Sequence, residues 1–179
     1  SDVNVTREVL SAASKVNAIV DHVNSSIFLK NISIYQRRGY MATSLTEIKN
    51  KSDVIIVFSN NLFGTYPRLM EKFLATKNSF SVNSKKKEIY VIGNKTSNSR
   101  DCNIRDKRIT YVDFNNRNIT RLLNSFISKK NESSIGNQVF NKLLTSIETS
   151  KYLSVLWATS EFDSYKECDE IIYNISAYI

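Results

Sequence analysis

Uninterrupted apolar runs along the chain predict strands that are covered on both faces. The clearest is Asp53–Phe58, with the sequence DVIIVF, which lies between polar segments. Such runs are typical of parallel strands, because helices cover both sides of a parallel sheet. Further strands are predicted at Glu88–Ile92, Ile109–Phe114 and Tyr152–Ala158, and a shorter one at Ala18–Val23.

Between these runs, apolar residues recur at helical spacing. The first predicted helix covers residues 6–18, with Thr6 as its N-cap and Val9, Leu10, Ala13 and Val16 on one face. Others are predicted at Ser44–Asn50, from Pro67 onward, and over residues 118–130, 136–150 and 164–179. The residues expected to face inward from the later helices are Leu69, Met70, Phe73 and Leu74; Val139, Phe140, Leu143, Leu144 and Ile147; and Ile171, Ile172, Ile175 and Tyr178.

This alternation predicts an α/β fold with a three-layer parallel, Rossmann-like sheet. No Pro/Gly-rich linker divides the chain, so we expect a single α/β domain over residues 1–179, with 151–179 open to assignment to an adjoining lobe. Open sheets of this type bind ligands beyond the carboxyl ends of their strands. The polar segment after Phe58 is therefore the predicted ligand crevice.

Composition and charge narrow the class of protein. With 41% hydrophobic and 23% charged residues, the chain has the composition of a folded domain. No apolar run approaches the roughly 20 residues of a membrane span, and no signal peptide is apparent, so we expect a cytoplasmic protein without membrane contact. A net charge of +8 raises the possibility of an anion- or nucleic-acid-binding module. Nucleic acid is disfavoured, because the basic run Lys85–Lys87 is short and Asp101 and Asp106 interrupt the basic residues of 100–108.

Several common kinds of site are excluded or disfavoured. The chain has four glycines and neither a GxGxxG nor a GxxxxGK[ST] motif, which excludes ordinary dinucleotide and P-loop sites. Cys102 and Cys168 are far apart and His22 is the single histidine, so zinc and iron–sulfur sites and hydrolytic triads are disfavoured. The acidic residues of 161–170 are predicted to open the last helix, where the helix dipole favours negative charge, rather than to bind a cation.

Two segments together resemble a known family. Residues 36–68 read QRRGYMATSLTEIKNKSDVIIVFSNNLFGTYPR, and residues 17–31 read NAIVDHVNSSIFLKN. With the same spacing, they resemble the molybdenum- or tungsten-pterin subunit of formylmethanofuran dehydrogenase, a member of the molybdopterin oxidoreductase superfamily. The resemblance rests chiefly on Gly39-Tyr40, the lead-in TSLTEIKN, Asn61 and Pro67-Arg68, and weaker likenesses continue along the chain. It implies a sheet of the molybdopterin oxidoreductase type.

The departures from that family all lie along its cofactor path. The family's metal-ligating cysteine corresponds to Ile27, which cannot coordinate a metal, so no metal ligand is expected here. A loop glycine corresponds to Ser59, and the proline after Asn61 corresponds to Leu62. The family-equivalent cofactor-binding positions are Ser59, Asn60, Asn61, Asn94 and Thr96, and we expect them to be degenerate. No cofactor, and no catalytic residue, is therefore expected.

The resemblance implies a non-redox scaffold subunit, a pseudoenzyme, in tetrahydromethanopterin-linked one-carbon metabolism. It is similar in this respect to the metal-free counterpart of the dehydrogenase subunit in the formyltransferase/hydrolase complex. Its expected partners are therefore protein subunits, including one of the amidohydrolase type. Arg37, Arg38, Tyr66 and Arg68 are the candidates for contact with an anionic substrate or a partner subunit.

Three alternatives stay open. One is a fragment of an active oxidoreductase that carries a molybdenum- or tungsten-pterin guanine dinucleotide. Another is a cofactor-free domain like that of the large iron–sulfur subunit of respiratory complex I. The third is the anion- or nucleic-acid-binding module that the net charge suggests.

Overall fold

The fold is built on one parallel sheet. The computed structural model describes residues 2–21, 25–39, 41–58, 62–76, 87–93, 106–113, 138–158 and 168–178. Four strands, β1 (Val54–Phe58), β2 (Glu88–Gly93), β3 (Ile109–Asp113) and β4 (Leu153–Trp157), form a sheet in the order β3-β2-β1-β4. All three neighbouring pairs are parallel, so the predicted α/β class and the four later strands are confirmed.

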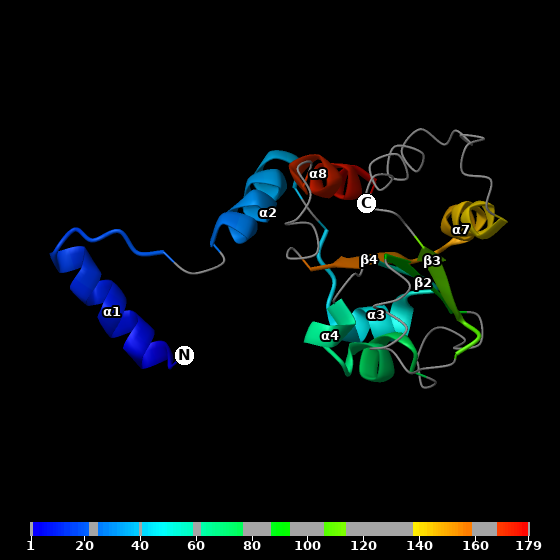
Figure 1. Ribbon diagram of the computed structural model, residues 1–179, viewed down its shortest axis with the longest axis horizontal. Coiled ribbons are helices and arrows are strands. Elements are labelled where there is room, and N and C mark those ends of the chain that lie inside the picture. The colour runs from blue at the N-terminus through cyan, green and yellow to red at the C-terminus, as the bar shows by residue number, and fades with distance from the viewer. Residues whose placement is uncertain are drawn as a thin grey trace.

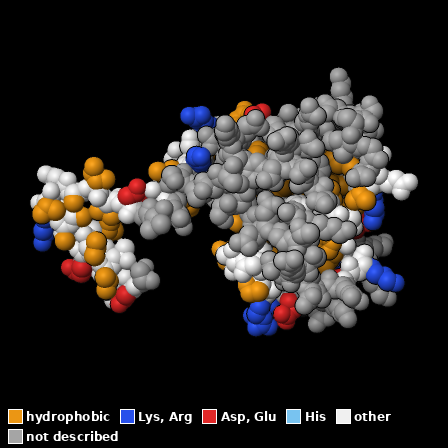
Figure 2. Space-filling model, viewed as in Figure 1, with side chains coloured by type: hydrophobic (Ala, Val, Ile, Leu, Met, Phe, Trp, Pro, Cys, Tyr) orange, Lys and Arg blue, Asp and Glu red, His pale blue; other side chains and the backbone are white. Residues whose placement is uncertain are grey.

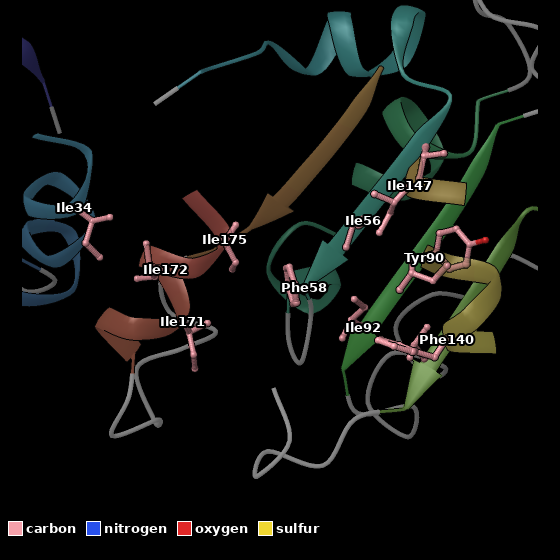
Figure 3. Packing of buried hydrophobic residues seen from close by; sticks show 13 residues of the cluster. Ile34, Ile56, Phe58, Tyr90, Ile92, Phe140, Ile147, Ile171, Ile172 and Ile175 are labelled. Carbon is pink, nitrogen blue, oxygen red and sulfur yellow. The ribbon is translucent and has the colours of Figure 1, made fainter. Parts of the chain in front are cut away.

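Helices on both sides of the sheet make a three-layer arrangement (Figure 1). One apolar cluster joins alternate strand residues such as Ile56, Phe58 and Tyr90 to α2 (Ser25–Arg38), α7 (Gln138–Thr149) and α8 (Cys168–Tyr178). Figure 3 shows part of this cluster, with Ile34 of α2 facing Ile172 of α8. The inward positions predicted for α7 and α8 are confirmed where their side chains are described, except that Val139, in the first turn of α7, is 37% exposed.

The opposite face is covered by α3 (Leu45–Lys51), α4 (Leu62–Thr65) and the π-helical turn η1 (Met70–Leu74). Their buried residues Ile48, Phe63 and Met70 pack against Ile55, Val57, Ile89 and Val91 of the strands. Helix α3 begins as the sequence predicts. The Ser44 hydroxyl accepts from the Glu47 amide at 3.2 Å, and a Glu47 carboxylate oxygen accepts from the Ser44 amide at 3.4 Å.

The helix predicted to begin at Pro67 is corrected by the structure. The segment after the β1 loop first forms α4, and Pro67 then lies in a turn closed by the Leu69 amide and the Tyr66 carbonyl at 3.0 Å. The next helical turn begins only at residue 69. The proline thus ends one helical turn and leads into the next, while the predicted inner stripe still faces the core, with Met70 and Leu74 fully buried.

Two predictions for the N-terminal region are wrong. Helix α1 (Val3–Lys15) is capped by Asp2, whose carboxylate accepts from the Asn4 amide at 3.0 Å, so Thr6 lies inside the helix. Residues 18–21 of the predicted strand Ala18–Val23 are not in a strand, and Ile19 is 98% exposed. Asn17 adopts a positive φ of 51°, which turns the chain out of α1, and none of the described strands pairs with the residues that follow.

Helix α2 was not predicted, although its signals are present in the sequence. Arg37 and Arg38 fill its last turn, and Gly39 follows at φ +73° with its amide donating to the Tyr35 carbonyl at 2.7 Å. The predicted helix over residues 118–130 lies outside the described residues. None of the described helices is both long and apolar enough to cross a bilayer.

Candidate functional site

The carboxyl edge of the sheet between β1 and β4 is the candidate functional site. The chain leaves β1 toward β2 on one side, while β4, reached from β3, returns to the other side of β1. The direction of the connections therefore reverses between β1 and β4, and ligands of open α/β sheets bind at this switch point. At this edge Phe58 and Trp157 are paired across the two strands, and Phe58 is 3% exposed.

The predicted cofactor-binding positions adjoin this edge in the chain but lie outside the described residues. Ser59, Asn60 and Asn61 follow Phe58 directly, and Asn94 and Thr96 follow the end of β2. The described residues that come next in the chain, Leu62 and Phe63, are 5% and 1% exposed and belong to the apolar cluster on the α3/α4/η1 side of the sheet.

Tyr66 and Arg68 lie in the turn between α4 and η1. Tyr66 is 56% exposed, and the Arg68 guanidinium forms an exposed ion pair with Glu71 at 3.4 Å. Both side chains are accessible on the α3/α4/η1 side of the sheet. They could contact a ligand or a partner protein without rearrangement of the core.

Arg37 and Arg38 lie on a different face from that pair. They end α2, which packs against α8 on the opposite side of the sheet. The Arg38 guanidinium lies 4.0 Å from the ring centroid of Tyr173 and donates to the Tyr173 hydroxyl. The structure therefore does not bring the four predicted contact residues together, and it engages Arg38 in the α2–α8 contact.

Sequence reasoning missed a pair of basic residues at the amino edge of the sheet. Lys87 is the last residue of the short basic run Lys85–Lys87, yet it is 1% exposed. Burial, followed by the charges of Arg108 and Lys49, lowers the pKa of Lys87 to about 8. The signal available in the sequence was its position directly before the buried strand β2.

Arg108 occupies the corresponding position before β3. Its guanidinium donates to the carbonyls of Ala75 and Thr76, at 2.6 and 3.2 Å, and pairs with Asp106 at 2.5 Å. It thereby satisfies carbonyl groups at the end of η1. Lys87 is buried and Arg108 is half-buried, and both bind backbone carbonyls, so neither directs its charge toward a ligand.

A carboxylate network joins β2 to α7 at the same edge. The Glu88 Oε2 atom accepts from the Tyr90 hydroxyl at 2.7 Å and from the Ser146 hydroxyl at 2.6 Å. Burial alone raises the pKa of Glu88, but hydrogen bonds from Ser146 and Tyr90 outweigh it and the pKa is lowered. Among the described residues, no three His, Cys, Asp or Glu side chains converge to hold a metal ion.

Comparison with known proteins gives a likeness of fold. No family model matches the sequence, and no curated protein matches it. Among solved structures, the chain is similar to one in the crystal structure of the formyltransferase/hydrolase complex from Methylorubrum extorquens in complex with methylofuran. The TM-score is 0.70 at 14% identity, over 97% of this chain and 46% of that one. The chain thus shares the fold of part of that protein and spans less than half of its length.

Proposed function

We propose that this chain is a cofactor-free structural subunit, or part of one, in a one-carbon enzyme complex, with a sheet of the molybdopterin oxidoreductase type. The observation that carries the proposal is the likeness of fold over 97% of the chain to a protein of a formyltransferase/hydrolase complex. The residue pattern of Gln36–Arg68 supports it independently, because that pattern resembles the pterin-binding subunit of formylmethanofuran dehydrogenase.

The side chains on the expected cofactor path do not fit a metal–pterin group. Ile27 has no donor atom for molybdenum or tungsten. Leu62, in place of the loop proline, is the first residue of α4; it is 5% exposed and belongs to the apolar cluster that α3, α4 and η1 form with the strands. Ser59 replaces the loop glycine of the family and so adds a Cβ where close backbone approach to the pterin dinucleotide is needed. These residues support a structural role over a redox one.

An exposed surface on the α4–η1 turn supports a role in subunit contact. Tyr66 and Arg68 combine an aromatic ring with a guanidinium, a composition enriched where proteins bind one another. We assign this surface to a partner subunit, which we take to be of the amidohydrolase type. The Tyr66 ring would bury apolar area there, while Arg68 would exchange Glu71 for a carboxylate of the partner.

Metal analysis of the natural full-length protein, affinity-purified from its native host, tests the proposal. We expect molybdenum and tungsten far below one atom per chain, together with an amidohydrolase-type subunit in a constant ratio to the chain across fractions of a sizing column. A Tyr66→Ala, Arg68→Ala double variant should lose that partner, whereas Lys72→Ala, an exposed change on the neighbouring turn, should keep it.

Other outcomes would replace the proposal with a named alternative. Molybdenum or tungsten near one atom per chain would indicate an active pterin oxidoreductase. Co-purification with respiratory complex I subunits would indicate the domain of that large subunit. Salt-sensitive retention on RNA or DNA, without a protein partner, would indicate a nucleic-acid-binding module.

A further inference from the structure

Helix α1 is amphipathic, and its apolar side is uncovered. None of its residues is buried, and Val5, Val9 and Leu10 are 58%, 55% and 50% exposed. In Figure 1 the helix lies apart from the sheet and its flanking helices, and Figure 2 shows hydrophobic side chains gathered on it. Since helices of this length are only marginally stable alone in water, an apolar face of this kind needs a partner surface.

The spacing of the apolar residues fits packing against another helix. Val5, Val9, Ala12 and Val16 follow one another at intervals of four, three and four residues. This is the seam of a two-helix coiled coil, in which a and d positions alternate. In that frame Val9 and Val16 occupy a positions, and Val5 and Ala12 occupy d positions. Val16 is the C-cap residue directly after the last helical residue, Lys15, and Leu10 occupies a b position away from the seam.

The charges beside the seam indicate which helix fits. Glu8 and Lys15 each directly precede an a position, so both lie on one flank, whereas Thr6 and Ala13 on the other flank are uncharged. In an antiparallel pair of identical helices, corresponding flanks face each other. Glu8 of each copy then faces Lys15 of the other copy, which gives two ion pairs of opposite charge.

A parallel pair lacks this complementarity, because the charged flank of each helix would face Thr6 and Ala13 of the other. A lipid surface is also a poorer match. Interfacial helices carry a polar face rich in Lys and Arg. The ionisable residues of α1 and its cap are Asp2, Arg7, Glu8 and Lys15, which sum to zero.

We propose that α1 docks antiparallel on α1 of a second copy of this chain. Val9 of each copy packs beside Ala12 of the other, Val5 packs beside Val16, and Glu8 pairs with Lys15. Within the described structure no ion pair involves Glu8 or Lys15, so both are available for this contact. The inference concerns self-association and is independent of the proposed one-carbon role.

The size of the contact sets its strength. Thirteen residues make a helix about 20 Å long, and valine and alanine side chains bury little area. Two such helices bury less than the roughly 1,200 Å² of stable interfaces, and each copy carries a net charge of +8 that opposes association. The dimer is therefore weak, and its population depends on protein concentration.

Sedimentation equilibrium of the full chain over a concentration series tests the proposal. We expect a reversible monomer–dimer equilibrium. Lys15→Glu, which sets two carboxylates against each other at both ends of the seam, should lower the association constant about tenfold, and Glu8→Lys should do the same with two ammonium groups. The double variant Glu8→Lys, Lys15→Glu restores opposite charges and should recover the dimer.

Matched controls separate the seam from general effects on charge and helicity. Arg7→Glu makes the same change of charge as Lys15→Glu on the face away from the seam, and it should leave association unchanged. Val9→Asp should abolish the dimer, and circular dichroism of each variant checks that the helices persist. A chain that stays monomeric at every concentration would overturn the proposal. So would a double variant as weak as the single ones, or a monomer that instead binds vesicles of anionic phospholipid.

Discussion

The Lys87 ammonium nitrogen lies 2.7 Å from the carbonyl oxygen of Lys49. Lys87 therefore caps the C-terminal end of α3, the helix that contains Lys49. A second, longer contact joins it to the Ile48 carbonyl at 3.5 Å. Carbonyls at a helix end need donors, and the helix dipole favours a cation there. These hydrogen bonds of the buried Lys87 therefore link the C-terminal end of α3 to the start of β2.

This burial makes stability depend on pH in a defined direction. The pKa of Lys87 falls from its ordinary 10.5 to about 8, so the folded chain binds fewer protons than the unfolded chain between these values. The free energy of unfolding should therefore rise with pH from about 8 to about 10.5, by on the order of 3 kcal/mol from this group. The measurement is urea unfolding of wild type and Lys87→Met at several pH values, because the difference between them isolates Lys87.

The exposed Lys72 provides the matched control for that series. Lys72→Met should follow the wild-type pH dependence throughout. A wild-type minus Lys87→Met difference that stays flat between pH 8 and 10 would show that Lys87 keeps an ordinary pKa in the folded chain.

The hydroxyl of Tyr90 should stabilise the contact between β2 and α7. Its ring is fully buried, and its oxygen lies 2.7 Å from Glu88 and 2.8 Å from Ser146. Tyr90→Phe removes both hydrogen bonds and leaves a carboxylate partly unsatisfied, so we expect a loss of about 1–2 kcal/mol in the free energy of unfolding. A double-mutant cycle with Ser146→Ala checks the coupling. The double variant should lose less than the sum of the single ones, and strict additivity would contradict the network.

Asp53 should be the main polar link between β1 and the start of β4. Its carboxylate accepts from the amides of Lys151 and Tyr152 at 2.7 and 3.0 Å, and from its neighbour Val54 at 3.0 Å. Asp53→Ala should cost about 2 kcal/mol, because hydrogen bonds to a charged group are lost. Asp53→Asn keeps one acceptor and should cost less. Faster hydrogen exchange of the Lys151 and Tyr152 amides in Asp53→Ala would locate the effect, and unchanged exchange would count against it.

The contact between Arg38 and Tyr173 should hold α2 on α8. The guanidinium stacks over the ring at 4.0 Å, and both side chains are partly open to water. Exposed cation–π contacts contribute about 0.5–1 kcal/mol, so Arg38→Ala should lower the free energy of unfolding by that amount. Arg37→Ala, the adjacent exposed arginine, is the control and should have no effect on stability. Equal effects of the two variants would rule out a specific role for Arg38.

The sheet was predictable because parallel strands that are buried on both faces are recognisable in the sequence. Each strand is a short apolar run, and α3 carries its own capping signal in Ser44 and Glu47. Helix α2 was missed because Asn31 and neighbouring serines weaken its apolar period, and only its tertiary contact with α8 completes it. The conformation of residues 18–21 depends on whether a strand lies beside them to pair with, which local sequence cannot show.

The position of the switch point of the sheet was predictable from the sequence, but the grouping of the candidate contact residues was not. The order of strand, loop and helix after Asp53 predicts a ligand crevice at the end of β1, and the sheet order puts that end of β1 beside β4. Arg38 and Arg68 were grouped because both are basic and lie in one resembling segment. The structure separates them because α2 and the α4–η1 turn cover opposite faces of the sheet. Two residues that are close along the chain can therefore lie on opposite faces of the sheet.

Trp157 provides a direct test of the proposal that the carboxyl edge of the sheet binds no pterin cofactor. It is the single tryptophan of the chain, and it pairs with Phe58 at the point where the sheet connections reverse. A bound pterin would lie near the indole and quench its fluorescence. Under the proposed cofactor-free role, we expect titration of the purified chain with molybdopterin guanine dinucleotide to leave Trp157 emission unchanged, after correction for absorbance by the pterin. Trp157→Phe, which removes the signal, gives the background. Saturable quenching in the wild type, above that background, would instead show that the edge binds the cofactor.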